Sequence, residues 1–290
     1  MTKTIVVLAA GMSSRMKKSV DSNIDFSKAN EANNKSKSLI TFGNKPFIYF
    51  LLKNILDAGF ETVIMVVGKD FNDFKNQIDD LKLPSKIEVK YAIQKIPSDR
   101  VKPFGTADAV SQTMQQLPIL QKTSFCVCNS DNLYSSSWLK LIRENSFENA
   151  VLAYDRDSLD FPKERVSSFS ILMMDTEFNL VNFIEKPTPE QVSENLDENG
   201  KIRVSMNIFK FNGNQSFDFI KNCPINPLRN EKELPSALVN MISEDGLYVR
   251  GIPIAEHVPD LTSKADINTI QKLIDSNWYK VKLFSKFKGW

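Results

Sequence analysis

Residues 4 to 17 read TIVVLAAGMSSRMK, and this stretch decides the fold. The run from Thr4 to Ala10 is almost entirely apolar and rich in β-branched residues, which is typical of a strand buried on both faces. Gly11 ends the run and predicts a tight loop after it. Strands covered on both faces belong to parallel sheets, so the stretch indicates an α/β fold from its first element onward.

The rest of the first half continues this pattern, because apolar runs of strand length alternate with helical patterns. We expect strands at 61–67, 87–93 and 124–128, and helices at 46–58, 71–81 and 106–116. Pro46 near the start and Gly59 just past the end mark the first of these helices. The alternation predicts a doubly wound, Rossmann-like mixed sheet.

The second half is less regular but belongs to the same unit. The expected strands lie at 150–154, 166–174, 178–184 and 202–211, and the expected helices at 215–222, 233–243 and 264–275. No break in composition and no proline-rich or serine-rich linker divides the chain. We therefore expect a single large domain over residues 1–275, followed by a basic and aromatic C-terminal tail over 276–290.

The composition excludes several classes of function. The chain has 290 residues, with 37 Lys and Arg against 35 Asp and Glu, one histidine and three cysteines. One histidine cannot form a two-histidine zinc site, and the cysteines at 126, 128 and 223 lack the spacing of a structural zinc module. A formal charge of +2 gives no strongly basic surface, and no apolar run reaches the ~20 residues that span a bilayer. We expect a cytoplasmic protein without stable membrane insertion and without a nucleic-acid partner.

Residues 17–37 differ from the rest of the chain. They are dense in Lys, Asn, Ser and Asp with little to bury, so they predict a mobile loop inserted in the glycine-loop region. Because this loop follows the first strand, we expect it at the carboxyl end of the sheet, where doubly wound folds bind ligands. A long loop there is typical of a lid or binding loop, and an insertion without a role is the alternative.

The loop after the first strand carries groups that suit a polyphosphate. Gly11 lets backbone amides approach phosphate oxygens. Ser13 and Ser14 can donate hydrogen bonds through their hydroxyls, and Arg15 can offset charge. The pattern is neither a P-loop, which needs Gly-Lys-Ser/Thr, nor the GxGxxG dinucleotide motif.

With these residues the chain resembles the sugar-phosphate nucleotidylyltransferases, a family of the nucleotidyltransferase superfamily with the nucleotide-diphospho-sugar transferase fold. The family signature LAAGxGxR...PKxL is similar to residues 8–15 followed by Lys37-Ser38-Leu39. The resemblance implies catalytic roles for Arg15 and Lys37. It implies a nucleotide site formed by Leu8, Ala9, Ala10, Gly11, Met12, Ser13 and Ser14.

Two further segments match the nucleotide side of the family. Gln94, followed by Gly105 and Thr106, looks like the glutamine and GTA segment that contacts the base and the sugar. Asp131 follows an expected strand and resembles the family's metal-binding aspartate, and Asp260 resembles the second one. Gln94 facing water, Asp131 in a turn and Asp260 as a helix N-cap are the structural alternatives.

Other matches concern the acceptor. Glu185-Lys186-Pro187 is similar to the EKP motif, in which the glutamate meets sugar hydroxyls and the lysine meets the sugar phosphate. Asn207 lies in a segment that resembles the lining of the acceptor pocket. A solvated strand end is the alternative for the first motif.

The chain also departs from the family pattern. Ser13 replaces the second glycine of the signature, and Asn207 replaces a common glycine. Ser36 stands where proline usually precedes the lysine, so Lys35 is the alternative to Lys37, although Leu39 favours Lys37. Relatives that act on molybdopterin and on non-sugar alcohols share the first departure, so the acceptor stays open. Cys126 and Cys128 share one face of a strand, which is more typical of core packing than of a redox pair.

The resemblance implies transfer of NMP from an NTP to a phosphorylated small-molecule acceptor, with a sugar 1-phosphate expected and pyrophosphate released. The catalytic set would be Arg15, Lys37, Asp131 and Lys186, with Mg²⁺ held by Asp131 and Asp260. The alternatives are a cytidylyltransferase acting on phosphocholine or a polyol phosphate, and a catalytically silent relative that binds nucleotide or sugar phosphate. A homo-oligomer and binding of a membrane surface or nucleic acid by the tail also stay open.

Overall fold

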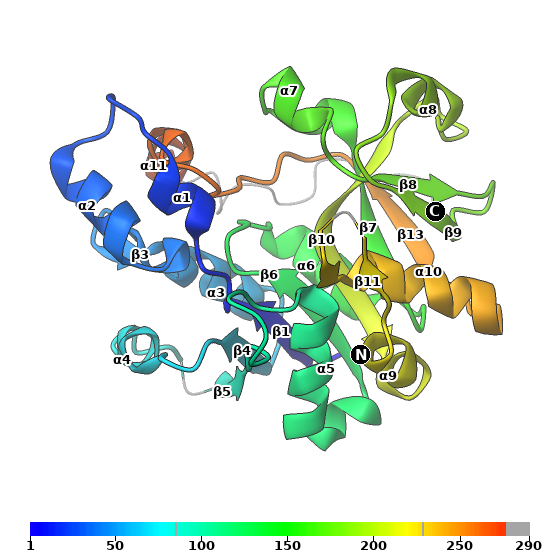
Figure 1. Cartoon of the computed structure of the whole chain (residues 1–290), viewed down its shortest axis with the longest axis horizontal. Helices are drawn as coiled ribbons and strands as arrows, with labels where there is room; N and C mark the ends of the chain where they lie inside the picture. Colours follow the sequence, from blue (N-terminus) through cyan, green and yellow to red (C-terminus); the bar gives the residue numbers. More distant parts are fainter. Residues whose placement is uncertain (85, 228, 277–290) are drawn as a thin grey trace.

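A mixed sheet forms the centre of the molecule (Figure 1). The computed structural model describes residues 1–84, 86–227 and 229–276, so residues 277–290 of the expected tail lie outside the described part. Seven strands of the sheet follow the order β13-β7-β10-β6-β1-β4-β5. Their bounds are β1 Thr4–Leu8, β4 Thr62–Val67, β5 Glu88–Ile93, β6 Ser124–Asn129, β7 Ala150–Asp155, β10 Arg203–Asn212 and β13 Arg250–Ile254.

Strand directions make the sheet mixed, as the sequence predicts. Strand β1 pairs in parallel with β4 on one side and with β6 on the other, and β5 extends the parallel part beyond β4. Strand β10 is antiparallel to both β6 and β7. Two of the strands expected in the second half form a hairpin, because β8 (Ile171–Met174) pairs with β9 (Leu180–Ile184), and the hairpin joins the sheet through β10.

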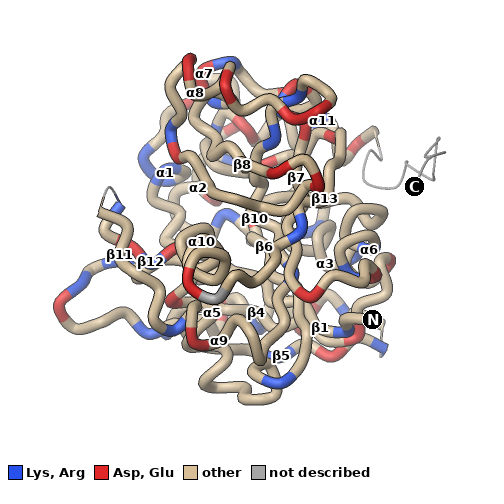
Figure 2. The backbone as a smooth tube through the Cα atoms, turned by 90° about the vertical axis from the view of Figure 1, so that its right-hand side faces the viewer, with Lys and Arg blue, Asp and Glu red and all other residues tan. Residues whose placement is uncertain are grey.

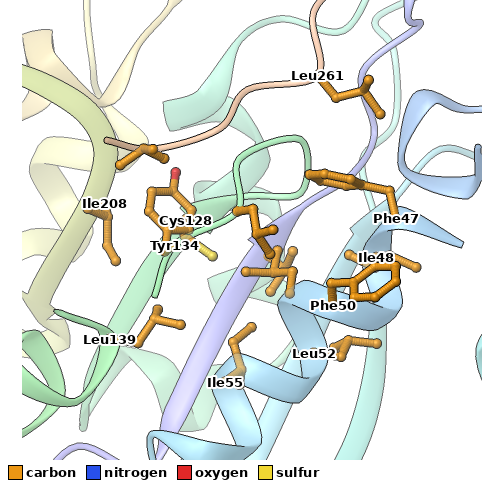
Figure 3. Close-up of a cluster of buried hydrophobic side chains, with 14 of the residues drawn as sticks. Phe47, Ile48, Phe50, Leu52, Ile55, Cys128, Tyr134, Leu139, Ile208 and Leu261 are labelled. Atoms are coloured by element: carbon orange, nitrogen blue, oxygen red, sulfur yellow. The ribbon is translucent and has the colours of Figure 1, made fainter. Parts of the chain in front are cut away.

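Helices cover both faces of the sheet, which confirms the doubly wound α/β architecture. Ile5 and Val7 point into one core, whereas Val6 points into the other. The first core is covered by α3 (Phe47–Asp57), α4 (Asn72–Asp79), α6 (Ser136–Glu144) and α11 (Ala265–Asp275). The second is covered by α5 (Thr106–Gln116), α9 (Gly213–Lys221) and α10 (Leu234–Asp245). Figure 3 shows side chains of α3 in one cluster with Cys128, Tyr134 and Ile208 in the first core.

The expected strand over 166–174 is wrong in its first half. Residues Lys163–Val166 form the short helix α7, and β8 starts at Ile171. The hydroxyls of Ser167 and Ser168 donate to the carbonyls of Glu164 and Arg165, at 2.9 and 2.7 Å. These side-chain bonds satisfy carbonyls at the helix end, so local polar chemistry outweighs the apolar pattern.

The structure contains elements that the periodicity did not predict. They are α6, β13, the helix α8 (Pro189–Glu194) and two small hairpins, β2 (Thr41–Phe42) with β3 (Lys45–Pro46) and β11 (Ile225–Asn226) with β12 (Glu231–Lys232). The hairpin strands are two residues long, which is too short to show an alternating pattern.

The segment 17–37, which its composition predicts as a mobile loop, contains a helix. It contains α2 (Phe26–Asn34) after the five-residue helix α1 (Ser14–Lys18) and before the 3-10 turn η1 (Lys37–Leu39). The Asp25 side chain caps α2 by accepting from Lys28 N, and the Glu31 carboxylate accepts from the amide and hydroxyl of Thr41. Polar capping rather than apolar burial therefore builds the helix. The segment between α1 and α2 contacts α11, because the Asn268 side chain donates to Asn23 O at 3.0 Å.

The two cysteines on β6 are part of the core. Cys126 and Cys128 are fully buried and free of disulfides. Burial raises the pKa of the Cys126 thiol to about 12, so it stays protonated and unreactive at neutral pH.

Within the described residues, no helix has the length and apolar character to cross a bilayer.

Tyr134, which follows β6, connects this part of the chain to β10 through its hydroxyl group. This hydrogen bond can be tested by its contribution to stability. The ring is fully buried, and the hydroxyl donates to Met206 O at 2.7 Å, where β10 departs from regular pairing with β7. Replacing Tyr134 by Phe leaves a buried carbonyl without this donor, so we expect a loss of about 1–3 kcal/mol in the free energy of unfolding. Urea denaturation measures it.

Tyr49→Phe is the control, because this half-buried ring on α3 packs edge-on against Phe50. Its effect should stay within about 0.5 kcal/mol. A Tyr134→Phe protein as stable as the parent would contradict the role assigned to this hydroxyl.

Candidate functional site

A cavity of about 430 Å³ opens where three parallel strands end. Its walls include Leu8 from the end of β1, Val66 from β4 and Asn129 from the end of β6. The carboxyl ends of parallel strands are where doubly wound sheets bind ligands. The remaining lining residues are Ala9 to Arg15, Ser36, Lys37, Ser38, Gln94, Lys102, Pro103, Gly105, Thr106, Ala109, Ser130, Asp131, Glu231 and Thr262.

Ser13 turns the loop between β1 and α1. Its φ angle is 55°, in the left-handed region that favours glycine, which explains why a glycine is usual at this position in the resembling family. The serine side chain is buried, and its hydroxyl accepts from Lys37 N at 3.1 Å. Ser13 therefore fastens the loop to the segment that carries Lys37. Helix α1 carries three basic residues, Arg15, Lys17 and Lys18. Figure 2 shows basic residues in blue at α1.

Lys37 and Asp131 meet at the cavity although 94 residues separate them in the chain. The Lys37 ammonium donates to the Asp131 carboxylate and forms an ion pair with it. Ser38 and Ser130 join the same two segments through a hydroxyl–hydroxyl bond of 2.8 Å. A cation and a carboxylate thus share one wall, and both side chains are largely but not fully buried.

Backbone hydrogen bonds join the segment around Asp260 to the segment around Asp131. Leu261 N donates to Asp131 O at 2.8 Å, and Leu133 N donates to Pro259 O at 2.9 Å. Burial raises the pKa of Asp260, and the negative charge of Asp131 raises it further, whereas Arg165 opposes the rise. The two carboxylates are therefore close enough to repel each other.

The side-chain contacts of Asp260 also exclude the N-cap alternative. Its carboxylate pairs with Arg165 at 2.6 Å and accepts from the Thr262 hydroxyl at 2.8 Å, while no side chain caps α11. Asp260 is not one of the residues that line the cavity.

The two aspartates provide oxygen donors for a divalent cation. Mg²⁺ is commonly held by one or two carboxylates together with substrate phosphates, and two repelling carboxylates are stabilised by a divalent charge. Within the described ranges, no group of three or more His, Cys, Asp and Glu side chains could hold a metal by itself. The donor set therefore fits Mg²⁺ bound jointly by protein and substrate.

Gln94 and the start of α5 form another wall. Gln94 is buried, so the alternative that it faces water is wrong. Its amide donates to Gly105 O at 3.1 Å and to an Asp108 carboxylate oxygen at 2.8 Å. Since both donors are used, the carboxamide offers its oxygen as an acceptor. Thr106 accepts from Leu234 N at 3.0 Å and so joins α5 to α10.

The expected acceptor residues lie outside the cavity lining. Glu185 is partly buried, whereas Lys186 and Asn207 are exposed and adopt positive φ angles of 47° and 57°. Asn207 lies where the register of β10 shifts against β7, and asparagine tolerates the left-handed region better than most residues. This bulge explains why a glycine is common there in the resembling family.

Glu185 belongs to a polar cluster that the sequence did not predict. Arg229 pairs with Glu185 at 3.3 Å and with Glu233 at 3.1 Å, and the Asn226 amide donates to both carboxylates. Burial raises the pKa of Glu233 to about 7, Arg229 opposes this rise and Glu185 adds to it. Glu233 directly precedes Leu234, so the cluster adjoins the wall formed by Thr106.

Sequence patterns did not identify several residues of the site. Lys102 and Glu231 line the cavity from irregular backbone and from a two-residue strand, where no periodic signal exists. Arg165 contacts Asp260 from the short helix α7. The motif context of Gly105 could have pointed to Lys102, because the two lie three residues apart.

The model of one protein family, described as nucleotidyl transferase, matches residues 32–253. The chain belongs to this family. The match spans most of the sheet and the candidate site from Lys37 to Glu231, and the family agrees with the resemblance found in the sequence.

Individual relatives are distant. The chain is 24% identical over 268 residues to the bifunctional protein GlmU of Staphylococcus saprophyticus, covering 92% of this chain and 50% of that protein. It is 23% identical to a glucose-1-phosphate adenylyltransferase of Hydrogenovibrio crunogenus, covering 92% and 60%. The chain therefore spans only half or somewhat more of the length of these relatives.

A solved structure has the same fold. HddC from Yersinia pseudotuberculosis, crystallised in complex with GMP-PN, superposes with a TM-score of 0.62 and 16% sequence identity. The superposition covers 94% of this chain and all of that one.

Gly105 provides a test of the wall that joins α5 to the β11–β12 hairpin. Its φ angle is 103°, and an added Cβ would lie 2.3 Å from the carbonyl oxygen of Lys232. Gly105→Ala must displace the hairpin or the start of α5, so we expect a loss of at least about 1–3 kcal/mol in stability and at least tenfold weaker nucleotide binding. Thermal unfolding and nucleotide titration measure the two effects.

Gly68→Ala is the matched control, because an added Cβ there meets nothing within 4 Å. It should leave nucleotide binding unchanged. Equal nucleotide affinities for Gly105→Ala and the parent would show that this wall is not part of the binding site.

Proposed function

We propose that the protein transfers a nucleoside monophosphate from an NTP to a phosphorylated acceptor and releases pyrophosphate. The observation that supports this most is the convergence of the signature loop, Lys37 and Asp131 on one cavity at the carboxyl ends of β1 and β6. Sequence motifs more than 90 residues apart thereby meet in one site. The family and relatives named as glucose-1-phosphate adenylyltransferases support the same reaction class.

The proposed chemistry needs positioning and charge neutralisation rather than a general base. A phosphate oxygen of the acceptor, already ionised at neutral pH, attacks the α-phosphorus of the NTP. The bond from the α-phosphorus to the oxygen that bridges to the β-phosphorus breaks, and pyrophosphate leaves in line with the attacking oxygen. The protein must hold two polyanions together, and preorganised cations lower the barrier by offsetting the charge that develops.

In this proposal each polar residue has a defined task. The backbone from Leu8 to Ser14 borders the phosphates, and Arg15 offsets charge on the leaving pyrophosphate. Lys37 leaves Asp131 and contacts the α-phosphate when substrate brings a stronger negative charge. The buried Gln94 reads the base with its carboxamide oxygen, next to Gly105 and Thr106.

Mg²⁺ is the proposed cofactor, held by Asp131 and Asp260. When bound, it would reduce the repulsion between the phosphate groups and stabilise the developing charge. The chain's own contribution is to hold the two aspartates next to each other, through the backbone contact of Leu261 with Asp131 and the ion pair of Asp260 with Arg165.

The proposed acceptor is a sugar 1-phosphate, with Glu185 contacting hydroxyls, Lys186 contacting the phosphate, and Asn207 at the edge of the pocket. The names of two kinds of relatives support it, glucose-1-phosphate adenylyltransferases and a putative UTP–glucose-1-phosphate uridylyltransferase of Methanocaldococcus jannaschii. The Asn226 amide donates to both Glu185 and Glu233, and Leu234 directly after Glu233 donates to Thr106, so an acceptor bound at Glu185 would lie near the wall that contains Thr106.

The central experiment is a screen of each NTP with a panel of phosphorylated acceptors and Mg²⁺, with pyrophosphate release as the readout. The panel contains sugar 1-phosphates, phosphocholine and polyol phosphates. Acceptor-dependent release supports the proposal, and the productive pair identifies base and acceptor. Nucleotide binding without any release across the panel would favour a catalytically silent relative.

Asp131→Asn tests the proposed metal carboxylate. It keeps the size of the side chain but removes the charge, so we expect kcat to fall at least about a hundredfold with the fold retained. Asp79→Asn is the control, because Asp79 pairs with Lys75 on the surface of α4, away from the cavity. Normal turnover by Asp131→Asn would refute the metal assignment.

Lys186→Met tests the acceptor phosphate contact. The side chain is exposed and can be changed without disturbing the core, so we expect the acceptor KM to rise at least about tenfold while the KM for NTP stays the same. Lys90→Met on the edge strand β5 is the control. An unchanged acceptor KM would contradict the role proposed for Lys186.

A further inference from the structure

Arg165 has no role in the motifs, yet it holds two carboxylates beside the cavity. Its guanidinium pairs with Asp260 and with Asp266, each at 2.6 Å. About four fifths of the side-chain surface of each of these three residues is buried, so solvent screens the pairs far less than pairs on the open surface. Arg165 therefore links α7 both to Asp260 and to the first turn of α11.

The guanidinium is fixed in orientation as well as in position. It lies 4.4 Å from the ring centre of Phe161, and the Phe161 ring packs edge-on against His257 with centroids 4.7 Å apart. His257 Nδ1 in turn accepts from Asp160 N at 3.1 Å. Stacking on an aromatic ring leaves the edge of the planar guanidinium free to bind carboxylates.

Asp266 fixes the backbone of the turn that follows Asp260. One of its carboxylate oxygens accepts from Thr262 N at 2.9 Å and from Ser263 N at 2.6 Å, and the other pairs with Arg165. The turn from 260 to 266 is consequently held from both ends by one guanidinium.

Asp260 is held on its remaining sides by its neighbours. One carboxylate oxygen accepts from the Thr262 hydroxyl, and the other accepts from Arg165. Its backbone runs beside that of Asn132, the residue after Asp131. Each carboxylate oxygen has two lone pairs, so these contacts leave acceptor capacity for a cation.

We propose that Arg165 is a positioning residue for the second metal carboxylate: it holds the Asp260 carboxylate in a fixed orientation beside Asp131. This inference rests on the proposed metal site at Asp131 and Asp260. Groups that hydrogen-bond to metal-ligating side chains typically change metal affinity by about ten- to a hundredfold when removed. Arg165 does not touch the proposed substrates, and its effect passes through Asp260.

Direct Mn²⁺ binding, measured by electron paramagnetic resonance on the full chain with the NTP present, tests this inference. Arg165→Met should weaken Mn²⁺ binding about ten- to a hundredfold. Arg165→Lys should restore part of the affinity, because it keeps the charge but cannot contact both carboxylates in the same planar geometry. An unchanged or tighter Mn²⁺ affinity in Arg165→Met would overturn the inference, and the second outcome would mean that Arg165 competes with the cation.

Arg203→Met is the matched control, because Arg203 forms a buried pair with Asp197 at 2.7 Å, and neither residue lines the cavity. It should lower the unfolding temperature without changing Mn²⁺ affinity. An equal loss of Mn²⁺ affinity in both arginine variants would overturn the inference, because it would trace the loss to general destabilisation. If Arg165→Met does not fold, Arg165→Lys decides, and an affinity equal to that of the parent would overturn the role of the two-carboxylate contact.

Asp131→Asn separates the two levels of the argument. If it binds Mn²⁺ as tightly as the parent, the metal site of the proposed function is wrong, and the inference fails with it. If Asp131→Asn weakens binding but Arg165→Met does not, the metal site stands and the positioning role alone is overturned.

Discussion

Strand β1 is bonded in parallel to β4 on one side and to β6 on the other, and its side chains enter two separate apolar cores. Every other feature of the site depends on this constraint. Because β1 is buried on both faces, polar residues can follow it only where the strand ends. The same holds for β6, so Ser13 and Asp131 emerge at the same edge of the sheet. The cavity lies at this edge because parallel strands place all of their carboxyl ends together.

Charge at this edge is balanced within the protein. Lys37 pairs with Asp131, and Arg165 pairs with Asp260, so two carboxylates that repel each other are each stabilised by a cation. The desolvation of such groups is costly unless they are paired, which explains why the pairs form. In the proposed reaction the incoming phosphates and cation would replace part of this internal balance. The near-neutral total charge of the chain therefore conceals a local concentration of both signs.

Two backbone positions show how this chain replaces glycine. Ser13 and Asn207 both have φ angles in the left-handed region, and both stand where the resembling family commonly has glycine. Ser13 offsets the conformational cost with a hydrogen bond from Lys37 N, which a glycine could not accept. Asn207 is a residue type that tolerates the region, and its amide N–H donates to the Ser205 hydroxyl at 3.1 Å. Both positions thus hold a left-handed backbone conformation with a residue that adds a polar side chain.

The sequence alone determined the α/β class, the order of the main strands and helices, and many of the residues that line the cavity. Long buried strands and amphipathic helices carry a periodic signal. Short sequence motifs can be recognised without periodicity, and they include residues 8–15, Lys37, Gln94, Gly105 and Asp131, which line the cavity. Only the tertiary structure decided the pairing of Lys37 with Asp131, the cluster of Glu185, Arg229 and Glu233, and the hold of Arg165 on Asp260. These contacts join segments from different parts of the chain, through two-residue strands and a four-residue helix that leave no periodic trace. The sequence pattern did not predict helix α2, because caps and ion pairs rather than an apolar face stabilise this helix.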